Sequence, residues 1–144
     1  MALKRFGVLG WPVAHSRSPA MHRAAYAALG LTDWHYQKLP VPPDVFAETV
    51  RSLPAAGYAG ANVTLPHKEA ALAVADEATD AAREIGAANT LTFGPDGAIH
   101  ADNTDAPGLI AAIGEPLPSV TTMPRSVQAC RSTFTGSARQ VKTA

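Results

Sequence analysis

Residues 60–68 read Gly-Ala-Asn-Val-Thr-Leu-Pro-His-Lys, and this stretch decides the fold. It predicts a buried strand over 60–65 that Pro66 ends, because proline cannot donate to a strand ladder. A helix is then expected from His67 to about Val74, with His67 itself in the turn or at the surface. Side chains alternate along a strand, so Asn62 and Thr64 should share one side of it.

Further strands and helices alternate on both sides of this stretch. Proline after serine or proline marks two helix starts, at Ser18-Pro19 and Pro42-Pro43, and Gly30 and Gly86 follow helix ends. The expected strands cover 5–9, 34–39, 90–93 and 98–101, and the expected helices cover 18–29, 45–53, 79–85 and 105–113. The alternation predicts an α/β fold, a three-layer α/β/α sandwich with a mostly parallel mixed sheet and one antiparallel strand.

The helix that begins at Ser18 has an apolar repeat. Ser18 is expected to be its N-cap, with Pro19 as the first helical residue. Five residues recur at helical spacing and are expected to face the sheet, namely Met21, Ala24, Ala25, Ala28 and Leu29.

Composition excludes several classes of protein. The chain has 144 residues, of which 47% are hydrophobic and 17% charged, so a globular fold is expected. Its formal net charge is zero, which gives no electrostatic reason to expect a nucleic acid or a membrane as partner. Cys130 is the single cysteine, so neither an internal disulfide nor a multi-cysteine metal site is expected. We expect a cytoplasmic location and no metal.

The charge is unevenly distributed along the chain. Residues 1–114 hold eight basic and eleven acidic residues, whereas residues 115–144 hold four basic residues and one acidic residue. The last 30 residues also contain nine Ser or Thr and three Pro, without a sustained apolar period. This predicts a folded domain over 1–114 and a tail of unrelated composition over 115–144, which a frameshift or a fusion near codon 115 would produce.

Polar residues gather at the ends of the predicted strands, where open α/β sheets bind ligands. Hydroxyls, amides, one amine and one carboxylate are what a site needs to hold a small polyhydroxylated acid and move a proton on it. The candidates are Ser16, Ser18, Asn62, Thr64, Lys68, Asn89 and Asp105. All of these except Asn89 also have a local explanation: serine and aspartate cap helices or stabilise turns, Asn62 and Thr64 form structural hydrogen bonds, and a lone lysine is usually solvated.

Four motifs in this order resemble the N-terminal, substrate-binding half of shikimate dehydrogenase. They are Gly-x-Pro-Val-Ala-His-Ser-x-Ser-Pro-x-x-His at 10–22, Gly-Ala-Asn-Val-Thr-Leu-Pro-x-Lys at 60–68, Gly-Ala-x-Asn-Thr-Leu at 86–91 and Asp-Asn-Thr-Asp at 102–105. The resemblance covers about residues 5–113.

The resemblance implies an NADP-linked interconversion of 3-dehydroshikimate and shikimate. It implies that Ser16 and Ser18 hold the substrate carboxylate, and that Lys68 and Asp105 form the catalytic pair. It further implies substrate contacts by Asn62, Thr64 and Asn89. Residues 115–144 show no Gly-rich phosphate turn, so we expect no NADP site in this chain and little or no turnover by it.

Two alternatives remain open from the sequence. The chain could be a catalytically idle domain that binds shikimate or quinate, or part of a quinate/shikimate dehydrogenase, since the substrates differ little. Self-association into a homo-oligomer is expected through the exposed sheet face or the tail.

Overall fold

The computed structural model describes residues 3–114, and contacts divide the chain into one unit over 1–108 and a second from 109 onward. The predicted tail over 115–144 lies outside the described residues, so the domain boundary near Gly114 stays a prediction. The strands are β1 (Lys4–Gly10), β2 (Trp34–Pro40), β3 (Tyr58–Val63), β4 (Glu77–Ala78), β5 (Thr90–Phe93) and β6 (Ile99–Asp102). The helices are α1 (Ser18–Ala28), a short 3-10 helix η1 (Pro43–Val45), α2 (Phe46–Ser52), α3 (Lys68–Val74), α4 (Asp80–Ile85) and α5 (Asp105–Gly114).

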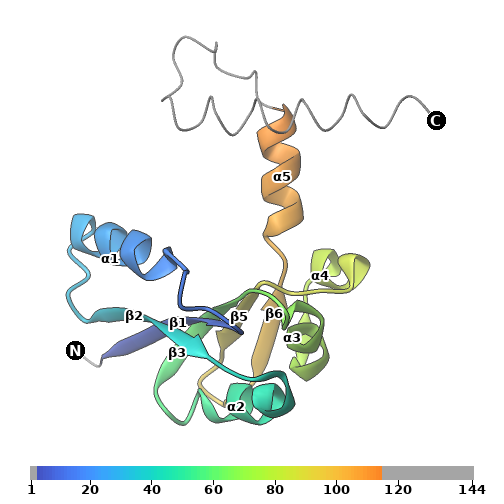
Figure 1. Ribbon diagram of the computed structural model, residues 1–144, viewed down its shortest axis with the longest axis horizontal. Helices are drawn as coiled ribbons and strands as arrows, with labels where there is room; N and C mark the ends of the chain where they lie inside the picture. The colour runs from blue at the N-terminus through green and yellow to red at the C-terminus, as the bar shows by residue number, and fades with distance from the viewer. Residues whose placement is uncertain (1–2, 115–144) are drawn as a thin grey trace. The chain divides into compact units, whose positions relative to one another are not determined.

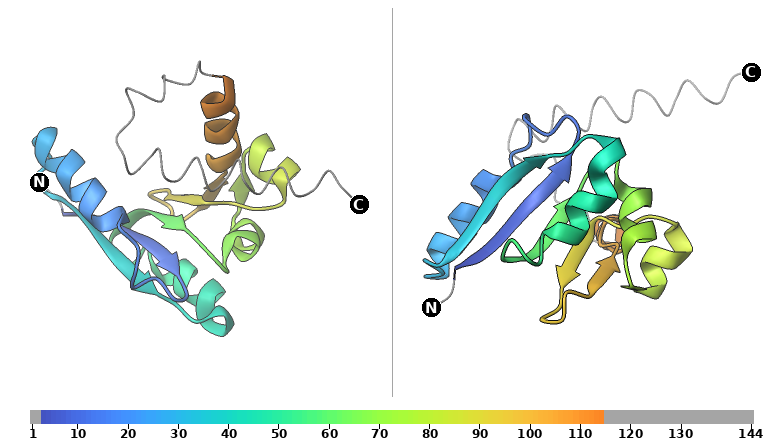
Figure 2. Two further views of the ribbon diagram at one scale, coloured as in Figure 1. Left: turned by 45° about the horizontal axis from the view of Figure 1, so that its top comes forward. Right: turned by 90° about the horizontal axis from the view of Figure 1, so that it is seen from below.

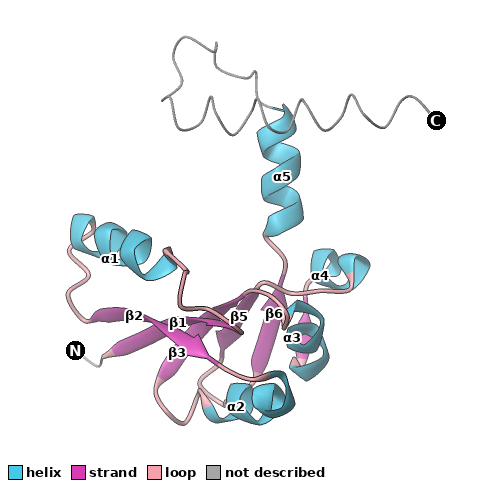
Figure 3. Cartoon of the chain, viewed as in Figure 1, coloured by secondary structure: helices cyan, strands magenta, loops and turns pink. Residues whose placement is uncertain are grey.

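The six strands form one sheet in the order β2-β1-β3-β5-β6-β4 (Figures 1 and 3). The pairs β1–β2, β1–β3 and β4–β6 are parallel, and β5 is antiparallel to both of its neighbours. The predicted mixed sheet with one antiparallel strand is therefore confirmed. β4 was not predicted, because a strand of two residues is too short to show a repeat in the sequence.

Helices cover both faces of the sheet within the first unit. Figure 2 shows α1 on one side of β1 and β2, with α2 and α3 on the other side. Neighbouring residues of β1 pack against opposite helical layers. Val8 lies in the cluster beneath α1, and Leu9 lies in the larger core beneath α2 and α3. The predicted three-layer arrangement is confirmed.

The face of α1 that meets the sheet differs from the predicted one. Met21 and Leu29 are exposed, whereas Pro19 is buried and His22 and Tyr26 are half-buried. The rings of His22 and Tyr26 pack against aromatic side chains of β1 and β2. The aliphatic repeat was a poor guide because aromatic residues fill the space between this helix and the sheet.

Local signals placed α4 correctly. The Thr79 hydroxyl accepts a hydrogen bond from the backbone N–H of Ala82 at 3.2 Å, which is an N-cap contact typical of threonine. Gly86 ends the helix in the left-handed region with φ 75°, a conformation that glycine adopts without strain.

None of the helices between residues 3 and 114 combines the length and apolar character needed to span a bilayer.

Phe46 should be a principal source of stability. Its side chain is 1% exposed in the larger core, and its ring stacks on that of His67 with centroids 4.4 Å apart. Phe46→Ala is expected to lower the free energy of unfolding by about 3–5 kcal/mol in urea denaturation, because it leaves a cavity in a packed core. Met21→Ala, at a site that is 64% exposed, is the control and should change it by less than about 0.5 kcal/mol. Equal effects of the two substitutions would contradict the assignment of this core.

Candidate active site

Strand direction brings the predicted polar residues to one edge of the sheet. β1, β3 and β6 run in one direction, so their carboxyl ends share an edge, and the antiparallel β5 begins at that same edge. Asn62 of β3 pairs with Thr90 of β5, which pairs in turn with Asp102 of β6. The residues that follow these strands therefore start close together.

Lys68 and Asp105 form an ion pair across this edge. Lys68 opens α3 and Asp105 opens α5, and Lys68 Nζ lies 2.6 Å from Asp105 Oδ2. Their side chains are 33% and 53% exposed, so a small molecule in solvent can reach both groups. An amine hydrogen-bonded to a carboxylate can exchange a proton with a bound hydroxyl, which is the chemistry of general acid–base catalysis.

The electrostatics of Asp105 follow from these contacts. The hydrogen bond from Lys68 lowers the pKa of the Asp105 carboxyl, and partial burial opposes this shift. A hydrogen bond from Asn89 and the charge of Lys68 lower the pKa further. Asp105 is therefore held as the carboxylate.

Asn89 supports this carboxylate from the other side. Its Nδ2 donates to Asp105 Oδ1 at 2.8 Å and to Thr104 Oγ1 at 2.9 Å. Its Oδ1 accepts from the backbone N–H of Thr104 at 3.0 Å and from Thr90 Oγ1 at 2.9 Å. Both amide hydrogens of this buried side chain are thus used within the protein, and its main effect is to position Asp105.

The two serines lie together at the start of α1. Ser16 Oγ donates to Ser18 Oγ at 3.3 Å, and the backbone N–H of Ser18 donates to Ser16 Oγ at 3.3 Å. The predicted N-cap role of Ser18 is wrong, since Arg17 occupies that position without a capping side chain and Ser18 is the first helical residue. The first N–H groups of α1 therefore do not depend on the Ser18 hydroxyl.

Asn62 is held by two residues that motif reading did not single out. Tyr36 Oη donates to Asn62 Oδ1 at 2.8 Å, and Asn62 Nδ2 donates to Thr90 Oγ1 at 3.5 Å. Tyr36 looks like an ordinary core residue of a strand, so its sequence context carries no signal of this contact. Thr90 follows Asn89 in the motif at 86–91, and this position in a motif was the only sequence feature that could have indicated its role.

Thr64 lies at the same edge, and within residues 3–114 its hydroxyl makes no hydrogen bond. Its backbone N–H donates to the Leu9 carbonyl at 2.9 Å, which continues the pairing with β1 just beyond β3. A Cβ added at Gly10 would lie 2.6 Å from Thr64 Cγ2, so only glycine leaves room for this side chain. Thr64 and Gly10 thus form a close backbone–side-chain contact between the ends of β3 and β1.

The structure brings most of the predicted site residues into one hydrogen-bonded set. We define the site network as Tyr36, Asn62, Thr90, Asn89, Asp105 and Lys68, which hydrogen bonds link in this order. Ser16 and Ser18 form a separate hydrogen-bonded pair. A hollow of about 340 Å³ on the α1 face is lined in part by Tyr36, Asn62 and Thr90. Four of the seven predicted residues belong to the network, namely Asn62, Lys68, Asn89 and Asp105. Ser16 and Ser18 form their own pair, and Thr64 follows Asn62 two positions along the chain.

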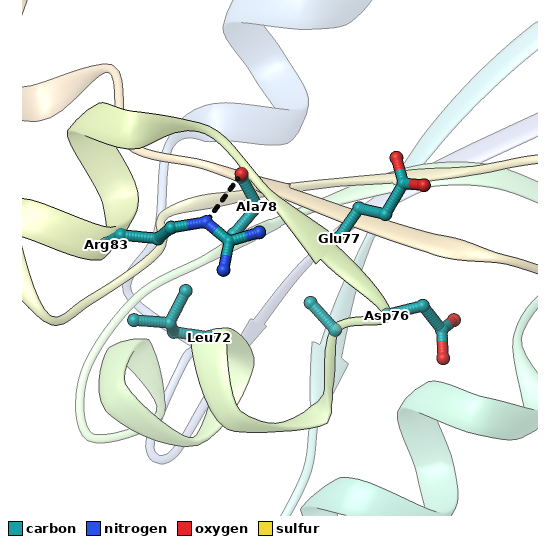
Figure 4. Close-up of a pocket in the computed structure, with 6 residues that line it drawn as sticks. Leu72, Asp76, Glu77, Ala78 and Arg83 are labelled. Carbon is teal, nitrogen blue, oxygen red and sulfur yellow. Dashed lines mark hydrogen bonds between the residues drawn. The ribbon is translucent and has the colours of Figure 1, made fainter.

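A separate hollow lies beside β4, the outermost strand at one side of the sheet. It has a volume of about 260 Å³, and Figure 4 shows Arg83 within it, with Nε donating to the Ala78 carbonyl at 3.1 Å. Its lining contains no member of the site network. Arg83 is thus occupied in holding the short edge strand.

The fold and the site network define an α/β/α domain with a lysine–carboxylate pair at the carboxyl edge of its sheet. Residues 8–91 match the family model described as the shikimate dehydrogenase substrate binding domain. The chain belongs to the shikimate dehydrogenase family, and the matched part is the family's substrate-binding domain.

Relatives in other organisms agree with this assignment. The chain is 56% identical over 112 residues to the shikimate dehydrogenase (NADP(+)) of Paracoccus denitrificans, covering 78% of this chain and 39% of that protein. It is 52% identical over 117 residues to the shikimate dehydrogenase (NADP(+)) of Methylobacterium radiotolerans, covering 81% and 41%. The chain spans about two fifths of the length of these relatives.

Solved structures show the same fold. The shikimate dehydrogenase of Mycobacterium tuberculosis superimposes with a TM-score of 0.72 at 45% identity, covering 78% of this chain and 42% of that one. The Thermus thermophilus enzyme, solved in complex with shikimate, gives 0.72 at 43% identity and covers 83% and 45%. The family resemblance inferred from the motifs is confirmed.

The ion pair predicts a measurable titration. Lys68→Met removes the hydrogen bond and the charge that hold the pKa of Asp105 below its ordinary value of 3.8, so this pKa should rise. A carboxyl ¹³C NMR titration measures it, with Lys4→Met as the control. Because the folded-state pKa is lowered, the pair stabilises the fold above the unfolded-state pKa and loses this effect as pH falls through the folded-state pKa. An unchanged Asp105 titration in Lys68→Met would contradict the pairing.

Proposed function

We propose that this chain is the substrate-binding domain of an NADP-dependent shikimate dehydrogenase, and that the site network binds shikimate or 3-dehydroshikimate. The observation that carries the proposal is the contact of 2.6 Å between Lys68 Nζ and Asp105 Oδ2 at the edge where the polar segments meet. Family membership and the shikimate-bound Thermus thermophilus structure support the choice of ligand.

Lys68 and Asp105 are the proposed catalytic residues. Oxidation of a ligand hydroxyl to a ketone releases a proton from oxygen and a hydride from carbon. The Lys68–Asp105 pair accepts the proton, directly from the hydroxyl that lies against it, and returns it in the reverse reaction. NADP⁺, when bound by the complete enzyme, supplies the hydride acceptor.

The remaining predicted residues are assigned to binding. Ser16 and Ser18 present two adjacent hydroxyls, which suit a carboxylate. Asn62 and Thr64, at the end of β3 and just beyond it, are assigned to hydrogen bonds with the ligand hydroxyls. Asn89 has both amide hydrogens committed to Thr104 and Asp105, so we assign it to holding the catalytic carboxylate, with any ligand contact shared with these bonds.

Binding without turnover is the expected behaviour of the 144-residue chain. The part that matches the family is the substrate-binding domain, and the chain covers 39–41% of its relatives. The chain would then act in isolation as a shikimate- or quinate-binding domain. NADP⁺ reduction with shikimate or quinate tests this expectation, and turnover by the purified chain would overturn it.

Cytoplasmic location, self-association and the absence of nucleic-acid and membrane partners stay predictions from the sequence. Light scattering over a range of concentrations measures the self-association. A strict monomer at all concentrations would contradict it.

Shikimate should stabilise the fold. At a concentration of about 100 times Kd, a ligand adds roughly 2.7 kcal/mol to the free energy of unfolding, and thermal unfolding should shift upward accordingly. Lys68→Met should weaken binding, because a hydrogen bond from a charged group is lost, whereas Lys4→Met should not. No shift for the unmodified chain in millimolar shikimate would overturn the proposed ligand.

A further inference from the structure

The partners of Asn89 fix which atoms of the site network donate hydrogen bonds and which accept them. The backbone N–H of Thr104 can only donate, so the Asn89 atom 3.0 Å from it must be the carbonyl oxygen Oδ1. The Asp105 carboxylate can only accept, so the Asn89 atom 2.8 Å from it must be Nδ2. Two independent partners therefore require the same orientation of the Asn89 amide.

The orientation of the Asn89 amide determines, through Thr90, the orientation of the Asn62 amide. Because Asn89 Oδ1 is an acceptor, the Thr90 hydroxyl at 2.9 Å must donate its single hydrogen to it. Thr90 Oγ1 then has only lone pairs left for its other neighbour, so the Asn62 atom that faces it must be Nδ2. Asn62 Oδ1 consequently faces Tyr36, and the phenol must donate to it.

Tyr36 is built to make that donation. It lies on β2, and its ring passes over Val8 of the intervening β1 to reach Asn62 on β3. The ring of His22 stacks on it with centroids 4.0 Å apart and an interplanar angle of 9°. Burial raises the pKa of Tyr36 to about 12, and a hydrogen bond with Ser18 opposes this shift only in part. The phenol therefore keeps its hydrogen.

We propose that Tyr36 and Thr90 are positioning residues that hold the Asn62 amide from both ends, so that Asn62 offers an N–H, not a carbonyl, to the ligand. One Nδ2 hydrogen goes to Thr90, and the second has no partner within the described residues. This subsite therefore selects a ligand oxygen that can accept a hydrogen bond, such as a hydroxyl, ketone or carboxylate oxygen. The identity of that ligand as shikimate rests on the proposed function, and the orientation of Asn62 does not.

The Asn62 side-chain amide reports its own orientation in the ligand-free protein. In the ¹⁵N-labelled 144-residue chain, its two hydrogens should give separate resonances, and the hydrogen that Thr90 Oγ1 accepts should exchange slowly with solvent. Tyr36→Phe and Thr90→Val each remove one end of the restraint without a large change of volume. Each should speed this exchange by about tenfold, and Thr90→Ser should restore the slow rate because it restores the hydroxyl.

Matched variants separate this effect from general loosening of the sheet. Tyr58→Phe removes another buried phenol, one that accepts from Gln37 and lies outside the network. Thr92→Val makes the same substitution two positions after Thr90 in β5, where the side chain lies on the same side of the strand. Neither should alter the Asn62 amide. If Tyr36→Phe does not fold, Thr90→Val and Thr90→Ser decide alone, and an Asn62 amide that is unchanged in Thr90→Val overturns the proposal.

Calorimetry with shikimate then tests the consequence for binding. Tyr36→Phe and Thr90→Val should bind about fivefold more weakly than the unmodified chain, while Thr90→Ser and Tyr58→Phe should bind as it does. Wild-type affinity in Tyr36→Phe and Thr90→Val would overturn the link between Asn62 orientation and recognition. If the unmodified chain does not bind shikimate but the amide experiment gives the expected result, the proposed ligand is wrong and the positioning role stands.

Discussion

The pairing of Asn62 with Thr90, and of Thr90 with Asp102, is the constraint on which the rest of the site depends. It joins the carboxyl ends of β3 and β6 through the start of the single antiparallel strand, so that three chain segments with polar residues begin at one edge. A register slip of one residue would turn every side chain of β5 to the other face of the sheet. The apolar side chains of Leu91 and Phe93 prevent such a slip, because they are buried on the opposite face.

Mutual hydrogen bonding explains why so many polar groups are tolerated at this edge. A half-buried amide or hydroxyl costs free energy unless it finds a partner, and here each side chain of the network is the partner of the next. No buried side-chain nitrogen or oxygen in residues 3–114 lacks a hydrogen bond. A network that ends at a carboxylate, accepting from Asn89 on one oxygen and from Lys68 on the other, also has a defined direction. The local explanations for single residues and the functional one are thus compatible, because the bonds that satisfy these groups also orient them.

The sequence was informative where structure depends on neighbouring residues. Proline signals marked the segment before α2 and the turn before α3, and Gly86 marked the end of α4, while the alternation of strands and helices predicted the mixed sheet. Prediction failed where structure depends on distant contacts. His67 was expected in the turn or at the surface; it does lie in the turn before α3, but it is 2% exposed. Its Nε2 lies 2.7 Å from the Val41 carbonyl, 26 residues away in the chain. Tyr36 was missed for the same reason, since only the fold brings its phenol across β1 to Asn62.

The burial of His67 matters for the residue beside it. Its ring stacks on Phe46 in the core and contacts the Val41 carbonyl, while the Lys68 carbonyl accepts from the backbone N–H of Ala88 at 2.8 Å. The backbone at Lys68 is therefore fixed from two sides, by the core beneath α3 and by the segment that leads to Asn89. The flexible part of Lys68 is only its side chain, which remains one-third exposed. A fixed backbone with a long, reachable amine suits the role proposed for Lys68, which is to contact both a partner carboxylate and a ligand oxygen. It limits the search to a few side-chain rotations and leaves the proposed acid–base pair intact.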